Sequence, residues 1–202
     1  MKYIRHKKYN SGGFSLVELI VVIAIMAVLT GILAPTLIRN IEKSRRAKDM
    51  ANAKQIETVL TTALIEGQID IPVGRREVGY GAWVMICKNK SKAPDTYKNK
   101  SFSTYWCGAD MGITVGGVTS YDDTNARKNT QLENILEENG LSLSSLKSSS
   151  NGGSNGWDWI IIEVCYDKDG KTFSRIYSGY KNENGGINNM TAKTNIEKQM
   201  NR

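Results

Sequence analysis

The chain has 202 residues, 40% of them hydrophobic, and this length suffices for one modest hydrophobic core. Lys and Arg number 27 against 20 Asp and Glu, which gives a formal net charge of +7. His6 is the only histidine, so the rest of the chain lacks the imidazole of a serine triad, a zinc site or a neutral-pH general base. No motif indicates carboxylate or lysine catalysis. We therefore predict no catalytic residues, no metal site, no cofactor and no enzymatic activity.

The chain begins with a basic leader, residues 1–13, followed by an apolar run, residues 14–38. The basic residues of the leader are Lys2, Arg5, Lys7 and Lys8. The apolar run holds 25 residues with one ionisable side chain, Glu18, and about 20 apolar residues are enough to span a bilayer. A carboxylate at the centre of a span costs roughly 2.5–3.5 kcal/mol, and less near its end. We therefore predict a membrane-spanning helix in which Glu18 has a function.

The junction between leader and apolar run reads Gly12-Gly13-Phe14-Ser15-Leu16-Val17-Glu18. With the basic leader before it, this arrangement resembles the N-terminus of type IV prepilins and of the pseudopilins of related secretion and DNA-uptake machines. The resemblance implies that a prepilin peptidase cleaves between Gly13 and Phe14 and then methylates the new amine of Phe14. It also implies that Glu18 neutralises the amine of a neighbouring subunit during filament assembly.

Elementary electrostatics supports the same roles. Cleavage would leave Phe14 as an ammonium at a helix N-terminus, where the backbone N–H groups are also unpaired. Glu18 lies one turn further on, so its charge opposes both the ammonium and the positive end of the helix. Within one subunit this arrangement lowers the cost of burying the two charges only in part. A second subunit's ammonium would complete the pairing, since paired charges are tolerated where a lone buried charge is not.

The resemblance extends from residue 8 to about residue 66 and carries further expectations. Pilin helices usually contain a proline where this chain has Pro35, and Gly31 lies one turn before it. Pro35 removes a backbone hydrogen bond, so we predict a helix kink at Gly31 and Pro35. The implied partners are the prepilin peptidase, other pilin subunits and the pilus assembly machinery. The implied location is the cytoplasmic membrane before assembly and a cell-surface filament afterwards, with a role in adhesion or motility.

Other interpretations of the apolar run remain open. It could be a secretory signal peptide cleaved near Ala34, although Pro35 follows that site and the run exceeds the usual 7–15 residues. It could also be an uncleaved single-span anchor, because basic residues flank both ends and leave the orientation ambiguous. As a third alternative, Glu18 could have no function and simply extend its side chain to the membrane–water interface. The alternative functions are a solitary membrane-anchored or secreted surface binding protein, or a pseudopilin of a secretion or DNA-uptake machine.

Residues 39–66 predict an amphipathic continuation of the same helix, which ends before Gly67 and Pro72. The apolar positions from residue 37 on are Leu37, Ile38, Ile41, Ala47, Met50, Ala51, Ile56, Val59, Leu60, Ala63 and Leu64. From Phe14 to Glu66 such a helix would be roughly 80 Å long. No compact domain of this size encloses a helix of that length, so we predict that only its second half packs on a sheet.

Residues 67–180 predict a globular β-rich head. Strand candidates are 78–87, 111–120, 157–166 and 171–180, and 129–139 predicts a short helix. Asp167-Lys168-Asp169-Gly170 predicts a hairpin turn and only weakly resembles the start of a calcium loop. The Ser/Gly-rich segment 148–156 predicts a flexible linker, and the polar residues 181–202 a mobile C-terminal tail. The fold class is therefore α+β, a long N-terminal helix packed on a small antiparallel sheet.

Residues 88–101 form a lysine-rich stretch that we interpret as an exposed loop; its lysines are Lys88, Lys90, Lys92, Lys98 and Lys100. DNA binding by this loop is a weak hypothesis, because few aromatic residues are interspersed and charge runs are usually solvated faces. Without the leader the chain retains 23 basic and 20 acidic residues, a net charge of only +3. The net charge of the chain without its leader therefore gives little support for nucleic-acid binding.

The cysteines are Cys87, Cys107 and Cys165. None lies in a C-x-x-C pair, which disfavours zinc and thioredoxin-like chemistry. A disulfide between Cys87 and Cys107 would close a loop of about 20 residues and stabilise the head by on the order of 3 kcal/mol. Buried or free thiols are the alternative, and the sequence leaves both open.

Overall fold

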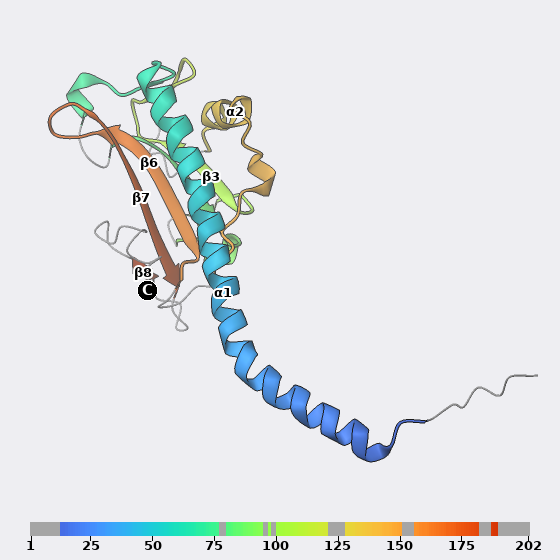
Figure 1. The fold of residues 1–202 in the computed structure, drawn as a ribbon. Helices are drawn as coiled ribbons and strands as arrows, with labels where there is room; N and C mark the ends of the chain where they lie inside the picture. The colour runs from blue at the N-terminus through green and yellow to red at the C-terminus, as the bar shows by residue number, and fades with distance from the viewer. Residues whose placement is uncertain are drawn as a thin grey trace, which may run out of the picture. The chain divides into compact units, whose positions relative to one another are not determined.

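The computed structural model describes residues 13–76, 80–94, 97, 100–120, 128–150, 156–181 and 187–189. The chain divides into two compact units, Met1–Ile41 and Glu42–Arg202. One long helix is followed by two antiparallel sheets, so the predicted α+β class is confirmed (Figure 1). The predictions for leader residues 1–12, for Lys98, for linker residues 151–155 and for most of the tail lie outside the described residues.

The helix α1 runs from Leu16 to Ile65 and contains Pro35. Its buried face begins at Arg46; the buried residues are Arg46, Asp49, Met50, Ala53, Ile56, Leu60, Ala63 and Leu64. The prediction was wrong for Ala47 and Ala51, which are exposed. The face that contains Ile56 and Leu60 also contains positions 49 and 53 at helical spacing, and this leaves 47 and 51 on other sides. The helix ends at Ile65, one residue before the predicted end, and Gly67 follows with a φ of +76°.

The larger sheet has the order β3-β2-β6-β7-β8, with every neighbouring pair antiparallel. Its strands are β2 (Ala82–Cys87), β3 (Tyr105–Ala109), β6 (Trp159–Tyr166), β7 (Thr172–Lys181) and β8 (Ile187–Asn189). The predicted β6–β7 hairpin is confirmed, with Gly170 at φ +75°. Asp167 Oδ1 accepts hydrogen bonds from the N–H groups of Asp169 and Lys171, so this carboxylate stabilises the turn. Strand β3 was not predicted.

Strand β8 corrects the interpretation of residues 181–202 as a mobile tail. Ile187 pairs with Lys181 and Asn189 with Gly179. An edge strand is held by main-chain hydrogen bonds, so a polar sequence such as Ile-Asn-Asn can form one.

A smaller three-stranded sheet has the order β1-β4-β5. It comprises β1 (Ile69–Asp70), β4 (Thr114–Val115) and β5 (Val118–Thr119). The single strand predicted over residues 111–120 is therefore wrong. Gly116 and Gly117 have φ values of +53° and +77°, which suit the two central positions of a tight hairpin turn. These two glycines fold the segment back on itself.

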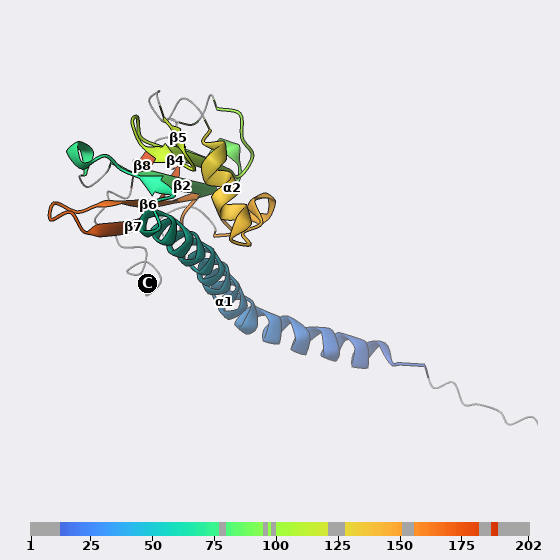
Figure 2. The same cartoon turned by 90° about the horizontal axis from the view of Figure 1, so that it is seen from above.

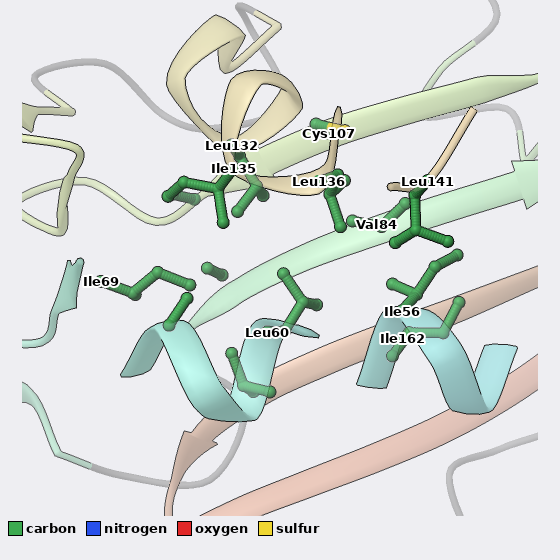
Figure 3. Packing of buried hydrophobic residues seen from close by; sticks show 14 of the residues in the cluster. Ile56, Leu60, Ile69, Val84, Cys107, Leu132, Ile135, Leu136, Leu141 and Ile162 are labelled. Carbon is green, nitrogen blue, oxygen red and sulfur yellow. The ribbon is translucent and has the colours of Figure 1, made fainter. Parts of the chain in front are cut away.

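The main core lies between the helices and one face of the larger sheet (Figure 2). Helix α2 (Thr130–Glu138) confirms the predicted helix; the Asn129 side chain accepts a hydrogen bond from Leu132 N at 2.9 Å and caps its start. Figure 3 shows Ile56 and Leu60 of α1 among the side chains of α2 and the sheet. The strand residues that face this core are Ala82, Val84, Ile86, Cys107, Ala109, Ile160, Ile162 and Val164.

The opposite face of the sheet is also buried, which corrects the interpretation of residues 88–101 as an exposed loop. The cluster on this outer face consists of Trp83, Met85, Cys87, Ala93, Tyr97, Trp106, Trp159 and Ile161. Ala93 and Tyr97, which belong to the lysine-rich stretch, are 1% and 7% exposed, whereas Lys90 is exposed. The apolar residues of this stretch cover the sheet, and its many lysines obscured that role in the sequence.

Candidate processing and assembly site

The predicted cleavage site lies just before α1. Gly13, Phe14 and Ser15 precede the helix, and Phe14 is 89% exposed. A Cβ atom added at Gly13 would meet no atom within 4 Å. A larger residue at position 13 is therefore compatible with the fold of the chain. Any requirement for a small residue at this position must come from a peptidase that binds it.

Glu18 caps the N-terminus of α1. Its Oε2 accepts a hydrogen bond from the backbone N–H of Ser15 at 2.9 Å, and Leu19 N donates to Ser15 O at 3.2 Å. Ser15 thus occupies the N-cap position and Glu18 the third helical position, the spacing of a capping box. The pattern Ser-Leu-Val-Glu contains this signal, although the cap was not predicted. The contact holds the carboxylate one turn beyond the residue that cleavage would expose.

The apolar part of α1 has no cover within the described structure. Its exposed apolar side chains include Leu16, Val17, Leu19, Ile20, Ile23, Met26, Leu29, Ile32, Leu33, Leu37 and Ile38. Among the described residues, α1 is the one helix long and apolar enough to cross a membrane. The helix continues through Pro35, and a Cβ atom added at Gly31 would meet nothing within 4 Å. The helix kink expected at these two positions stays a prediction.

The predicted Cys87–Cys107 disulfide is wrong for this fold. Both cysteines are free and fully buried. Cys107 faces the main core and Cys87 the outer cluster, on opposite faces of the sheet, so their side chains diverge. Burial and, to a lesser degree, the nearby Asp158 raise the pKa of Cys87 to about 12. Burial raises the pKa of Cys107 as well, and both thiols are therefore protonated and unreactive at neutral pH.

The second half of α1 contains a buried carboxylate that was not predicted. Asp49 is 0% exposed and accepts hydrogen bonds from four donors. These are Ser148 Oγ at 2.9 Å, Ser149 N at 2.8 Å, Ser150 N at 3.0 Å and Trp157 Nε1 at 2.8 Å. The described start of the predicted flexible linker, Ser148–Ser150, is therefore fixed on α1. An Asp within a helical apolar stripe was the available signal.

A second buried carboxylate lies on the outer face of the sheet. Glu163 of β6 is 2% exposed and accepts a hydrogen bond from Nε of Arg175, its cross-strand partner on β7. Burial raises the pKa of Glu163, and the Arg175 guanidinium opposes that shift. Its carboxylate is occupied by a structural ion pair. Within the described part of the chain, no group of three or more His, Cys, Asp or Glu residues is arranged to hold a metal ion.

Comparison with known families identifies the N-terminal segment. Residues 8–34 match the prokaryotic N-terminal methylation motif, which is the signal of type IV pilins and pseudopilins. Proteins with this motif are structural and not enzymatic. No curated protein and no solved structure matches the chain. The match and the apolar helix support a precursor of the pilin or pseudopilin type and fit anchoring in a membrane before assembly.

Proposed function

We propose that the chain is a structural subunit of a type IV pilus or a related filament. A prepilin peptidase cleaves it between Gly13 and Phe14 and methylates the Phe14 amine. The mature subunit stays in the cytoplasmic membrane through residues 14–38 until the assembly machinery adds it to a surface filament. The methylation motif over residues 8–34 is the observation that carries this proposal.

The surface of α1 supports polymerisation through this helix. The large apolar side chains from Phe14 to Ile41 are 44–89% exposed. Burying apolar surface contributes roughly 25 cal/mol per Å², so this part of the helix requires either lipid or other helices around it. A bundle of identical helices in a filament provides the second environment once the subunit leaves the bilayer.

The position of Glu18 supports a role in assembly. The carboxylate stays at the helix start through its bond to Ser15 N–H, beside the site of the future ammonium. In a packed filament the Phe14 ammonium of a neighbouring subunit would find a counter-charge here. Such a pair is favoured where apolar helices exclude water, because an isolated buried charge is strongly disfavoured.

The mature N-terminus tests this proposal. The mass of the chain recovered from membranes should begin at Phe14 and include a methyl group. A Gly13→Val variant should accumulate as an unprocessed precursor, because the larger side chain blocks the peptidase and not folding. A mature N-terminus near Ala34 would instead establish a secretory signal peptide, and an intact N-terminus with no filaments would establish a solitary anchored surface protein.

The same motif also occurs in pseudopilins, so a short filament of a secretion or DNA-uptake machine is the second candidate. Mass spectrometry of sheared surface material separates the two. A pilin should be abundant in the sheared fraction, whereas a pseudopilin should remain with the cells. DNA binding has weak support, because the lysine-rich stretch 88–101 covers the sheet.

A further inference from the structure

Four exposed cations follow the apolar run of α1. They are Arg39, Lys43, Arg45 and Lys48, and we name them the cationic collar. Helical spacing places Arg45 and Lys48 on the side of the helix roughly opposite Lys43. The charges therefore surround the helix and do not line a single face.

The acidic residues near these cations form hydrogen bonds with residues of the head. Asp49 is fully buried and bonded to the segment Ser148–Ser150 and to Trp157. The Glu42 side chain is 16% exposed and accepts hydrogen bonds from Ser150 Oγ at 2.8 Å and Arg46 Nε at 3.4 Å. Its Oε2 also lies 3.8 Å from Nη1 of Arg45, whose side chain stays 44% exposed, and an ion pair as exposed as this one is weak. Every exposed ionisable side chain from residue 39 to residue 48 is therefore basic. The sequence alone, with two acids among the cations, does not show this.

We propose that the cationic collar binds the headgroups of anionic phospholipids at the membrane surface from which α1 emerges. This inference rests on the proposed membrane insertion of residues 14–38. Lys43 lies five residues beyond Ile38, about 7.5 Å along a helix, and the headgroup layer extends roughly 5–7 Å beyond the hydrocarbon core. Lys48 lies about 15 Å beyond Ile38, where its long side chain can still approach the headgroups and feel their charge over a Debye length of about 8 Å.

Binding of this kind would set the depth of the subunit in the membrane. Hydrophobic matching alone permits a long apolar helix to tilt or slide. Cations that encircle the helix at the headgroup layer resist movement in both directions. Each basic residue near an anionic surface contributes roughly a fivefold gain in binding, the equivalent of about 1 kcal/mol.

The test compares phospholipid binding by the full chain in detergent micelles. Native mass spectrometry should show tighter binding of phosphatidylglycerol than of phosphatidylcholine. The triple variant Lys43→Gln, Arg45→Gln, Lys48→Gln should lose this preference by roughly 100-fold, given the contribution of each residue. The matched control Lys90→Gln, Lys168→Gln, Lys171→Gln removes three exposed head charges and should retain the preference. Inorganic phosphate at constant ionic strength should not displace the lipid.

Three results would overturn the inference. The first is an equal preference for phosphatidylglycerol in the collar variant and the head control. The second is displacement by inorganic phosphate, which would indicate a general phosphate site. The third is normal lipid binding but loss of filaments in the collar variant, which would assign the collar to a second copy of the chain. Flotation with phosphatidylcholine vesicles tests insertion separately: a chain that floats without any lipid preference contradicts only the collar, and one that does not float contradicts the proposed function too.

Discussion

The indole N–H of Trp157 donates a hydrogen bond to Asp49 Oδ2 at 2.8 Å, although the two residues are 108 positions apart in the sequence. Both side chains are 0% exposed. The contact joins the head half of α1 to the residues that lead into β6. It therefore fixes the start of the β6 segment on the second half of α1.

Asp49→Asn should destabilise the head by about 2–4 kcal/mol. The amide keeps one acceptor oxygen but replaces the other, Oδ2, which accepts from Ser148, Ser150 and Trp157, with a donor. Hydrogen bonds to a charged group contribute about 1.5–3 kcal/mol, and unsatisfied buried donors add a penalty. Urea denaturation followed by tryptophan fluorescence measures the change. The control Asp70→Asn makes the same substitution at an exposed position and should change stability by less than about 0.5 kcal/mol; equal effects would contradict the role of Asp49.

A fragment from Pro35 to Arg202 should be soluble, folded and monomeric. Its core is formed by residues from Met50 onward, and the uncovered apolar side chains between Phe14 and Leu33 are absent from it. Analytical ultracentrifugation and circular dichroism check the prediction. A fragment that forms stable oligomers would show that the head itself drives association.

Gly179→Ala should destabilise the head by about 1–3 kcal/mol through overpacking. Gly179 of β7 lies opposite Trp159 of β6, and a Cβ atom at Gly179 would lie 2.1 Å from Cζ2 of that ring. Gly108 has the same relationship to Trp83, at 2.3 Å. The rigid indole of Trp159 can move away only at a cost in packing energy. We therefore expect the near-ultraviolet circular dichroism to change along with the unfolding midpoint. Gly74→Ala is the control, because a Cβ atom there meets nothing within 4 Å.

Sequence patterns predicted the parts of the fold that depend on local signals. The pattern of residues 129–139 predicted α2, and Asp167–Gly170 predicted the β6–β7 hairpin. Some errors were local, such as the missed turn at Gly116 and Gly117, and others concern contacts between distant segments. Tyr97 covers the outer face of the sheet, and Asp49 accepts hydrogen bonds from residues between 148 and 157. Neither contact between distant segments produces a periodic pattern in the sequence. The N-terminal motif was recognisable because its seven residues are adjacent, whereas the inward direction of Glu42 and Asp49 required the structure.

Stability should fall as pH rises above about 9. The pKa of Cys87 rises to about 12 in the folded head, and burial raises the pKa of Cys107 in the same direction. The unfolded thiols lose protons near their ordinary pKa while the folded thiols keep theirs, so the unfolded state binds fewer protons and the free energy of unfolding decreases. This contribution is complete below the unfolded pKa and is lost as pH approaches the folded pKa. Burial of Tyr97 and Tyr177 also raises their pKa values and adds to the loss from pH about 10.

Urea midpoints measured between pH 8 and pH 10.5 check this slope. Cys87→Ala should reduce the slope by up to about 1.4 kcal/mol per pH unit, the value for one proton. An unchanged slope in that variant would exclude Cys87 as a source of the alkaline instability.

Glu18→Gln should prevent filament assembly while leaving membrane insertion and cleavage intact. Gln keeps the size of the side chain and an oxygen that can accept the Ser15 N–H bond, so the helix start is preserved. The variant removes only the negative charge, and a neighbouring Phe14 ammonium then lacks its partner. An uncompensated buried charge costs roughly 3–5 kcal/mol, and in a polymer this loss recurs at every subunit. Processed subunits should therefore accumulate in the membrane, and sheared filaments should be sparse or missing.

The control for this prediction is Ser15→Ala, which removes the N-cap hydroxyl but retains the backbone N–H and the Glu18 charge. Loss of an N-cap side chain costs about 1 kcal/mol, once per helix, and should leave filaments present. If Ser15→Ala abolished filaments as fully as Glu18→Gln, a general sensitivity of assembly to the helix start would explain both losses, and the counter-charge role would lose its support. Methylated Glu18→Gln filaments in normal numbers would contradict the charge pairing directly, because no other carboxylate lies in the apolar run from Phe14 to Ile38.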